Sequence, residues 1–442
     1  MSRVRIVHLG LGGFFRAHQA WYTGAAPDAA DWGIAAFTGR SRALADELTR
    51  QHGRYTLVVR GPHGDDMSEQ RAVSEALPGA DLAAWGDRMA RPEVAVVTLT
   101  VTEAGYRRDP HGGLDVDDPQ VRADLAALRD GGADLAALRG GAAVVTAPGR
   151  LVAGLAARRA AGAGPLAVVS CDNLPGNGTV TARVVTELAS TADPALAGWI
   201  RDNVSFVTTM VDRITPRTTS DDVRAVEKRT GRRDAAPVVT EPFTEWVLSG
   251  EFPAGRPAWE AAGARFVDDV HPHETRKLLL LNGGHSLLAY LGSARGHDTI
   301  AGAMADPVCR GWLDQWWDDA AWHVPLPAAD LTAYRAALVE RFDNPRIRHT
   351  LAQIAADGSQ KIPIRVLPVL RAERAEGRLP TGAVRILAAW IAHLRGAGAP
   401  VNDPGAAPYR ERAASPAAVL ALLAPDLAAD TALTEALAAA LA

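Results

Sequence analysis

The stretch RVRIVHLGLGGFFRAHQAWYTG, residues 3–24, joins a β-rich run, a glycine turn and a helical pattern. Gly10 and Gly12 occupy the first two positions of a G-x-G-x-x-G fingerprint. The first glycine of that fingerprint allows a tight turn, and the second lets the backbone approach a pyrophosphate at a helix N-terminus. Phe15 stands where the third glycine belongs. The stretch predicts the first βα turn of a dinucleotide-binding fold, with an ordinary turn as the alternative.

The alternation of strand and helix continues well beyond this turn. Further strand-like runs are DWGIAAFTGR, YTLVVRG, VAVVTLTVTEAGY, GPLAVVSCDN and VSFVTTMVDRITP. Strands that alternate with helices indicate a mostly parallel sheet covered on both faces. Pro and Gly cluster in SGEFPAGRPAWEAAGARFVDDVHP, and helical patterns such as LTAYRAALVERF dominate after it. We predict an α/β, Rossmann-type, NAD(P)-binding domain at residues 1–267 and an all-α substrate and catalytic domain at residues 268–442.

Composition excludes several classes of protein. The net charge of −4 and the lack of a basic patch argue against a nucleic-acid partner. No apolar run approaches the roughly 18 residues that span a membrane, and the N-terminus reads as a strand instead of a signal peptide. The two cysteines, Cys171 and Cys309, belong to no cluster with zinc-ligand spacing, so we expect no metal and a cytoplasmic location. A small molecule is the expected partner.

The end of the second strand bears on the choice of cofactor. NAD sites usually place an acidic residue there to hold the ribose hydroxyls. The segment FTGRSRALAD instead offers Arg40 and Ser41, with no carboxylate before Asp46. Arg and Ser suit a 2′-phosphate, so the sequence leans towards NADP over NAD. The alternative is a solvated loop in an arginine-rich protein.

Lysine is rare in this chain, because only three of the 47 Lys and Arg residues are lysines. Arginine stays protonated in proteins, whereas burial can lower the pKa of a lysine until it acts as a base. On one α-helix, Glu274, Lys277, Asn282 and His285 would share an arc of about 140°. Polar groups buried there need partners. The pattern predicts that Lys277 exchanges a proton; a snorkelling surface lysine is the alternative.

Other polar residues stand at strand ends or in turns. The amide of Asn173, in SCDNLPGNG, is placed to donate to an oxygen that gains charge during hydride transfer. Asp212 and Arg213, in MVDRITPR, follow a strand and predict either substrate contacts or a structural ion pair. Lys361 and Arg365, in DGSQKIPIR, could together bind hydroxyls or a carboxylate; alternatively, Lys361 caps a helix.

Seven stretches together resemble the mannitol dehydrogenase family, the polyol-specific long-chain dehydrogenases. In family order they are IVHLGLGGFFRAHQAWYT, TVTEAGY, SCDNLPGNG, MVDRITP, EPFTEWV, KLLLLNGGHSLLAYLG and DGSQKIP. The resemblance implies a Rossmann-type N-terminal domain, a helical C-terminal domain and metal-independent hydride transfer with NAD(P). It also implies that Lys277 is the general acid/base, that Asn173 and Asn282 polarise the substrate oxygen, that His285 orients the substrate, and that Glu274 lies on the proton route.

For the substrate, the resemblance implies contacts from Asp212 and Lys361 to hydroxyls, and we add Arg365 as a substrate-binding residue. The expected cofactor-binding residues are Gly10, Gly12, Phe14, Arg40, Ser41 and Thr102.

Two departures from the mannitol dehydrogenase pattern bear on the substrate. Gln353 stands where those enzymes carry Arg, and Arg365 stands where they tend to have Phe, so the fructuronate reductase branch looks closer. An arginine near Lys361 suits a uronate carboxylate. We expect interconversion of an open-chain polyol or aldonate with its keto form, of the D-mannitol/D-fructose type, with fructuronate or tagaturonate reduction as the alternative. A non-catalytic dinucleotide sensor is the remote alternative.

Overall fold

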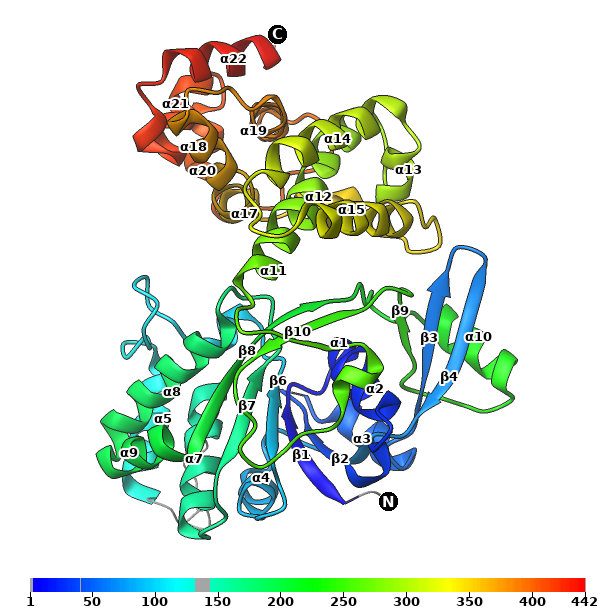
Figure 1. The fold of residues 1–442 in the computed structure, drawn as a ribbon, viewed down its shortest axis with the longest axis vertical. Coiled ribbons are helices and arrows are strands. Elements are labelled where there is room, and N and C mark those ends of the chain that lie inside the picture. Colours follow the sequence, from blue (N-terminus) through cyan, green and yellow to red (C-terminus); the bar gives the residue numbers. More distant parts are fainter. Residues whose placement is uncertain (1–2, 40, 132–143, 442) are drawn as a thin grey trace. The chain divides into compact units, whose positions relative to one another are not determined.

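The computed structural model describes residues 3–39, 41–131 and 144–441, without the side chains of 130 and 131. The chain divides into two compact units, residues 1–271 and residues 272–442. Figure 1 shows both units and labels their elements.

The first unit is built on an eight-stranded sheet with the order β11-β10-β8-β7-β6-β1-β2-β5. Neighbouring strands are parallel except β10, which runs antiparallel to β8. The mostly parallel sheet expected from the sequence is confirmed. The strands are β1 (Val4–Leu9), β2 (Gly33–Phe37), β5 (Val73–Leu77), β6 (Val96–Leu99), β7 (Leu166–Ser170), β8 (Val204–Asp212), β10 (Glu245–Ser249) and β11 (Arg265–Phe266).

The order β5-β2-β1-β6-β7-β8 is that of a doubly wound sheet whose winding reverses between β1 and β6. In such sheets ligands bind outside the carboxyl ends of the strands at the point of reversal. The glycine turn follows β1 directly, so the topology places it at that point.

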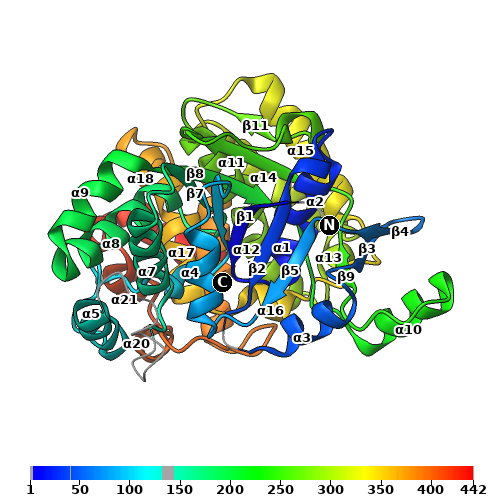
Figure 2. The same ribbon diagram turned by 90° about the horizontal axis from the view of Figure 1, so that it is seen from below.

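Helices cover both faces of this sheet, as Figures 1 and 2 show. The first unit contains the α-helices α1 (Gly13–Ala17), α2 (Gln19–Ala25), α3 (Ala43–Arg50), α4 (Leu82–Met89), α5 (Pro119–Gly131), α7 (Ala147–Ala160), α8 (Asn177–Ala192), α9 (Pro194–Asn203) and α10 (Ser220–Thr230). It also contains the 3₁₀ helices η1 (Ala29–Asp31), η2 (Glu103–Tyr106) and η3 (Trp259–Ala262). Two large apolar clusters, one on each face, explain why the central strands read as nearly continuous apolar runs.

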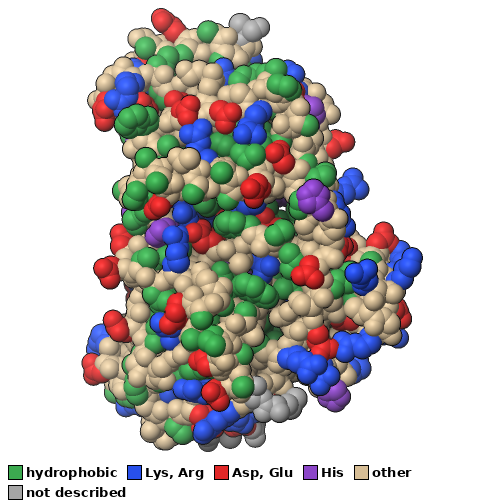
Figure 3. Space-filling model, turned by 45° about the vertical axis from the view of Figure 1, so that its right-hand side comes forward, with side chains coloured by type: hydrophobic (Ala, Val, Ile, Leu, Met, Phe, Trp, Pro, Cys, Tyr) green, Lys and Arg blue, Asp and Glu red, His purple; other side chains and the backbone are tan. Residues whose placement is uncertain are grey.

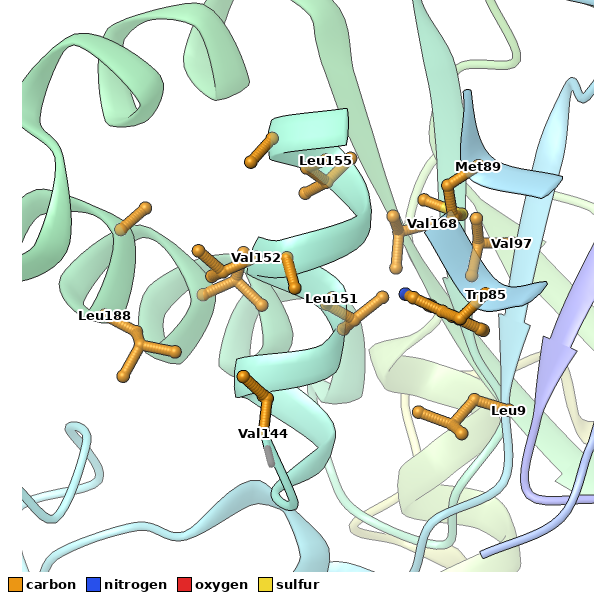
Figure 4. Packing of buried hydrophobic residues seen from close by; sticks show 14 of the residues in the cluster. Leu9, Trp85, Met89, Val97, Val144, Leu151, Val152, Leu155, Val168 and Leu188 are labelled. Carbon is orange, nitrogen blue, oxygen red and sulfur yellow. The ribbon is translucent and has the colours of Figure 1, made fainter. Parts of the chain in front are cut away.

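Helix α7 illustrates this packing (Figure 4). Leu151, Val152 and Leu155 of α7 belong to the same buried cluster as Trp85 of α4 and Val168 of β7. Burying each aliphatic side chain contributes about 1.5–3 kcal/mol. Hydrophobic burial of this kind holds the sheet in the form that positions its strand ends.

One strand predicted for the main sheet lies elsewhere. YTLVVRG forms β3 (Tyr55–Gly61), which pairs antiparallel with β4 (Gly64–Gln70) and parallel with β9 (Val238–Thr240). These three strands make a separate small sheet. The strand itself was correctly expected, but its sheet was not, because its partner β9 is far away in the sequence.

The second unit is helical, as the sequence predicted. Its α-helices are α11 (His271–Arg276), which begins at the last residue of the first unit, α12 (Gly283–Leu287), α13 (Ile300–Met304), α14 (Pro307–Ala321), α15 (Ala328–Phe342), α16 (Leu351–Ala355), α17 (Gly358–Arg365), α18 (Leu367–Ala375), α19 (Thr381–Leu394), α20 (Ala407–Arg412), α21 (Pro416–Leu423) and α22 (Thr431–Leu441). Two π-helices, η4 (Lys277–Asn282) and η5 (Leu288–Gly292), and the 3₁₀ helix η6 (Pro425–Leu427) complete it.

The surface carries charges of both signs. Acidic and basic side chains are interspersed over the face drawn in Figure 3. Within the described part of the chain, no helix combines the length and the apolar character needed to cross a membrane.

Candidate active site

The glycine turn after β1 is fixed by close backbone approach. Gly10 has φ +115°, and a Cβ there would lie 2.0 Å from the carbonyl oxygen of Thr100. The N–H groups of Gly10 and Leu11 both donate to the carbonyl of Phe37 at 2.9 Å. A Cβ at Gly12 would meet only the carbonyl oxygen of Gly10, at 3.4 Å. Gly10 is therefore required by the turn, whereas Gly12 leaves open space beside the backbone.

Phe15, at the third position of the fingerprint, has a packing role. Its ring is stacked on the imidazole of His8, with centroids 3.5 Å apart and planes 9° from parallel. The aromatic pair fills the contact between strand and helix that the third glycine normally makes close. Phe14 is partly buried and stacks on His18, at 5.0 Å, between the short helices α1 and α2.

His8 links two strands to the glycine turn. The Thr100 hydroxyl donates to the carbonyl of Gly10 at 2.9 Å, so it must accept from His8 Nε2, 3.3 Å away. Nδ1 of His8 then accepts from the Thr98 hydroxyl at 2.9 Å. Burial lowers the pKa of His8 to about 3, which keeps the ring neutral. Both ring nitrogens are satisfied, and the network holds the carbonyl of Gly10 in place.

The predicted cofactor contacts after β2 are only partly described. Arg40 lies outside the described residues. The exposed Ser41 accepts a hydrogen bond from the N–H of Ala43 at 3.2 Å. Arg42 forms two hydrogen bonds with Asp46, at 2.9 and 3.2 Å. The charge of Arg42 is therefore matched by a carboxylate, which leaves Ser41 as the polar group described at this strand end.

Asp172 clamps the loop after β6. Its carboxylate accepts from the N–H of Thr102 at 2.7 Å, from the N–H of Val101 at 3.1 Å and from the Tyr106 hydroxyl at 2.7 Å. Thr102 has φ +70°, a conformation that costs a residue other than glycine about 1–3 kcal/mol. Burial raises the pKa of Asp172. The carboxylate therefore holds a strained loop at the strand ends.

Asn173 follows this clamp directly and is exposed. Asn177, at the start of α8, donates to the carbonyls of Asp172 and Thr209 and accepts from the N–H of Thr209. These three bonds tie the end of β7 to β8. The loop that presents Asn173 is therefore anchored on both sides.

The structure brings several predicted residues of the first unit to one edge of the sheet. Gly10, Thr102 and Asn173 follow β1, β6 and β7, and the buried Asp212 is the last residue of β8. These four strands are consecutive neighbours and mutually parallel. Their carboxyl ends therefore lie together at the position where doubly wound sheets bind ligands.

Arg213, beside Asp212, has a structural role. It is buried and donates to the carbonyls of Ala17 and Glu241, and burial lowers its pKa to about 10. These bonds join α1, β8 and the segment after β9. Its donors are committed to the backbone, so we do not count it among the substrate contacts.

In the second unit, the predicted catalytic residues follow one another on a continuous helical path with a change of register. Glu274 lies in α11, Lys277 and Asn282 begin and end the π-helix η4, and His285 lies in α12. The expectation of a uniform α-helix is wrong. A π-helix bonds residue i to residue i+5. Lys277 and Asn282, five residues apart, therefore lie nearly above one another, closer in angle than an α-helix would place them.

His285 presents an unsatisfied nitrogen. The side chain is 7% exposed, stacks on Phe342 at 4.6 Å and meets His349 edge-on at 5.0 Å. Among the described residues, Nε2 of His285 has no hydrogen-bond partner. Burial, and then the nearby His349 and Arg365, hold the pKa of His285 well below its ordinary value. The ring is therefore neutral, and one of its buried nitrogens has no partner among the described residues.

Arg365 is a partly buried cation whose charge acts on this histidine. Its Nη1 donates to the carbonyl of Asn282 at 3.3 Å and to the Ser286 hydroxyl at 3.2 Å, both neutral acceptors. Within the described residues, its Nε is buried without a partner and the guanidinium pairs with no carboxylate. Burial lowers the pKa of Arg365 to about 10. A buried charge without a counterion is costly unless a ligand supplies one.

Lys361 lies on the same helix as Arg365, and its ammonium donates to the carbonyls of Ile354 at 3.2 Å and Ala356 at 2.6 Å. It therefore caps the C-terminal end of α16, as the structural alternative proposed. Burial, followed by the charge of Arg365, lowers the pKa of Lys361.

Three further polar residues lie near His285 and Arg365 and were not predicted from the sequence: Ser286, Arg341 and His349. Arg341 is buried at the end of α15, and its charge lowers the pKa of both His285 and His349. Nδ1 of His349 is also buried without a partner in the described structure. His349 lies just before α16, which begins at Leu351. No sequence signal marks these residues, because tertiary packing alone brings them to His285.

One other group has metal-ligand chemistry. Potential ligand atoms of His297, Asp306 and Cys309 lie within 4.8 Å of one another. Nε of Arg295 already contacts the Asp306 carboxylate at 2.6 Å, and His297 Nε2 contacts the same oxygen at 3.0 Å. Burial raises the pKa of the Cys309 thiol to about 11, which keeps it protonated. Arg295 supplies the positive charge here, so this group does not suit a cation.

Fold and strand-end arrangement together define a two-unit protein with a Rossmann-type sheet and a helical second unit. Residues 4–261 match the Mannitol dehydrogenase Rossmann domain, and residues 269–442 match the Mannitol dehydrogenase C-terminal domain. The chain belongs to the mannitol dehydrogenase family, whose members are polyol and sugar-acid oxidoreductases.

Three relatives illustrate the range of the family. The chain is 39% identical to D-mannonate oxidoreductase of Escherichia coli K12, over 89% of this chain and 80% of that protein. It is 37% identical to mannitol 2-dehydrogenase of Cereibacter sphaeroides, over 92% and 85%. The solved Pseudomonas fluorescens mannitol 2-dehydrogenase, a ternary complex with NAD and D-mannitol, matches with a TM-score of 0.82 and 35% identity, covering 100% of this chain and 91% of that one.

Proposed function

We propose that the protein is an NAD(P)-dependent dehydrogenase that interconverts a secondary alcohol of an open-chain aldonate or polyol with the corresponding ketone. The proposal assigns cofactor binding to residues 1–267 and substrate binding and acid/base chemistry to residues 268–442. When bound, the cofactor supplies or accepts the hydride. The open space beside Gly12 supports a pyrophosphate contact there, because a side chain at this position would occupy that space.

Lys277 is the proposed general acid/base. In the reducing direction it gives a proton to the oxygen of the former carbonyl, and in the oxidising direction it removes that proton. Asn282 and Asn173 donate amide hydrogens to the same oxygen and stabilise its developing charge. Glu274, one helical turn before Lys277, carries protons to the lysine. The register of η4, which aligns Lys277 with Asn282, supports this assignment.

The neutral imidazole of His285 is proposed to orient the substrate. Its Nε2 has no partner among the described residues, and a hydrogen bond from a substrate hydroxyl would satisfy it. Asp212 and Lys361 are proposed contacts to further hydroxyls. Because Lys361 already donates to two carbonyls, its contribution would come from its remaining donor and its charge.

The proposed substrate class rests on Arg365, a partly buried arginine with no described carboxylate partner. Arg341, Lys361 and Arg365 all act on His285 as positive charges, and the described hydrogen bonds of Arg365 go to neutral acceptors. An arginine recognises a carboxylate by paired, charge-assisted hydrogen bonds. We therefore propose a sugar acid as the preferred substrate, with D-fructuronate and its reduced partner D-mannonate as the first pair to test and tagaturonate as the second.

A neutral polyol is the second candidate. The relative from Pseudomonas fluorescens was solved with D-mannitol, and the present chain covers 91% of it. In this case Arg365 would bind hydroxyls of D-mannitol or D-fructose instead of a carboxylate. The two candidates use the same Lys277 chemistry and differ only in the group that meets Arg365.

Both NAD and NADP remain candidate cofactors in this proposal. The preference for NADP rests on Arg40, which lies outside the described residues, and on Ser41, which is exposed. The relative solved with NAD favours NAD. Comparison of NADH with NADPH separates the two.

The first experiment follows oxidation of NADH and NADPH with fructuronate, tagaturonate, fructose and xylulose. We expect turnover with the uronates; turnover restricted to fructose or xylulose would remove Arg365 as a carboxylate contact. Lys277→Ala should lower turnover by about 10²- to 10⁴-fold while cofactor binding persists. Lys228→Ala, at an exposed lysine of α10, is the matched control. Full turnover in Lys277→Ala would overturn the proposed mechanism.

A further inference from the structure

Two consecutive tryptophans contact the backbone of the π-helix that carries Lys277. Trp316 and Trp317 lie on α14 and are buried, with exposures of 0% and 1%. Trp316 Nε1 donates to the carbonyl of Leu279, and Trp317 Nε1 donates to the carbonyl of Leu280, each at 2.9 Å. Neighbouring indoles therefore bind neighbouring carbonyls in the middle of η4.

Two glycines make this contact possible. A Cβ at Gly283 would lie 2.5 Å from Cζ2 of Trp316, and a Cβ at Gly284 would lie 2.9 Å from Cδ1 of Leu313 and 3.3 Å from Nε1 of Trp317. Any side chain at Gly283 would push the aromatic ring away. The Asn-Gly-Gly sequence at the end of η4 is thus matched to the tryptophan pair on α14.

The indole donors discriminate between helical registers. A π-helix is rare and occurs mainly as single turns inside α-helices, so a local contact is needed to favour it over the α-helical register. In an α-helical register the carbonyls of Leu279 and Leu280 would point elsewhere around the axis, and the two buried N–H groups would lose their acceptors. Buried donors without acceptors are strongly disfavoured.

The register has a direct consequence for the catalytic residues. Asn282 and His285 both follow the carbonyls that the indoles bind, whereas Lys277 precedes them. A change of register between them would rotate Asn282 and His285 relative to Lys277. Misplacement of a catalytic group by about 1 Å can cost 10²-fold in rate.

We propose that Trp316 and Trp317 are positioning residues for the reaction. Their indole N–H groups select the π-helical register of Lys277–Asn282 and so set the angle between Lys277, Asn282 and His285. This inference rests on the proposed acid/base role of Lys277. It assigns to the tryptophan-rich stretch WLDQWW, residues 312–317, a specific polar contact with the segment that carries Lys277.

The test removes the N–H and keeps the shape. Benzothienylalanine has the bicyclic form of tryptophan with sulfur in place of N–H, and it can be incorporated at position 316, at 317 or at both. We expect kcat with the best substrate of the wild type to fall about 10- to 100-fold at each site, with the dissociation constant for NAD(P)H unchanged. A primary isotope effect with deuterated NAD(P)H should rise as the chemical step becomes limiting. Trp316→Phe and Trp317→Phe are simpler variants with the same expected direction.

Trp85 provides the matched control, because it is 1% exposed and its indole donates to the carbonyl of Arg150 at 2.7 Å, within the first unit. The same replacement at 85 should lower thermal stability but leave kcat unchanged. Full kcat at 316 and 317, or an equal loss of kcat at 85, would overturn the inference. Lys277→Ala is measured in parallel: if it is inactive while the 316 and 317 variants are fully active, only the inference fails, whereas an active Lys277→Ala overturns the proposed function and the inference together.

Discussion

Two arginines, Arg158 in the first unit and Arg365 in the second, differ in how completely the protein satisfies their donors. In the first unit, Arg158 of α7 is fully buried and donates five hydrogen bonds to the carbonyls of Met89, Arg91, Ala163, Gly164 and Pro165. In the second unit, the described bonds of Arg365 are two, and its Nε is left without a partner. All five N–H donors of the Arg158 guanidinium are bonded to backbone carbonyls. The Arg365 guanidinium has at least one N–H donor, at Nε, without a described acceptor.

The buried histidines of the two units repeat this contrast. His8 has both ring nitrogens bonded to threonine hydroxyls, whereas Nε2 of His285 is unsatisfied in the described structure. Native proteins satisfy most buried polar groups, so unsatisfied ones that gather in one place indicate a missing ligand. The first unit also contains buried unsatisfied groups, on Gln19 and Trp246. Incomplete hydrogen bonding therefore supports a functional role only where, as at His285, the residue also belongs to the predicted site.

The largest effect on stability is expected where the bonding is complete. Arg158→Leu should lower the free energy of unfolding by about 4 kcal/mol, because it leaves five backbone carbonyls without donors. Denaturant unfolding measures this loss. The folded fraction should keep wild-type kcat, and a loss of kcat without loss of stability would contradict the structural role of Arg158.

Arg365→Leu tests the opposite case. The variant should lower kcat/KM for a keto-uronate by about 100-fold, or about 3 kcal/mol, because a charge pair with the carboxylate is lost. Stability should be unchanged or improved, since a partly buried charge without a described counterion is removed. Arg371→Leu, at an exposed arginine of α18 that pairs with Asp426, is the control and should leave kcat/KM unaltered. Equal losses with fructose and fructuronate would show that Arg365 does not read the carboxylate.

His8 should make the free energy of unfolding of the first unit depend on pH, and the shift of its pKa fixes the direction of that dependence. Its pKa is about 3 in the folded protein and about 6.5 in the unfolded chain, so the stability it contributes is present above pH 6.5 and is lost as the pH falls towards 3. Between pH 7.5 and pH 5 this contribution amounts to about 2 kcal/mol. His8→Leu should flatten the dependence of unfolding free energy on pH, measured by urea denaturation, relative to His63→Leu at an exposed site. Parallel curves for the two variants would refute the assignment.

The smallest effect is expected at Ser286, which accepts from Arg365 and donates to the carbonyl of Asn282. Ser286→Ala removes one neutral acceptor, and kcat/KM for a uronate should fall about fivefold, in line with a single hydrogen bond of about 1 kcal/mol. Steady-state kinetics with fructuronate measure it. A loss as large as that of Arg365→Leu would mean that Ser286 itself contacts the substrate.

Much of the first unit could be predicted from sequence because its signals are local. The run ending at Gly10 identified the first βα turn, and runs of apolar residues located the strands whose ends carry Thr102, Asn173 and Asp212. The sheet membership of β3 was not predictable in this way, because strand pairing with β9 depends on contacts far apart in sequence.

In the second unit, local sequence patterns predicted some site residues but not the features that depend on tertiary packing. Scarcity of lysine pointed to Lys277 and periodicity placed it on a helix with Asn282 and His285. The π register was invisible, because it depends on Trp316 and Trp317, more than 30 residues away. His349 was missed for the same reason: a residue outside any motif acquires its place only through packing.

The π-helix also bears on the number of residues in the run Leu278–Leu281. One turn with bonds between residues five apart contains one residue more than the α-helical turn it replaces. Deletion of a single leucine from this run would leave an α-helical turn of nearly the same angular span, so the side chains after it would keep their direction relative to Lys277. The π turn thus accommodates one extra residue of sequence between Lys277 and the residues that follow it.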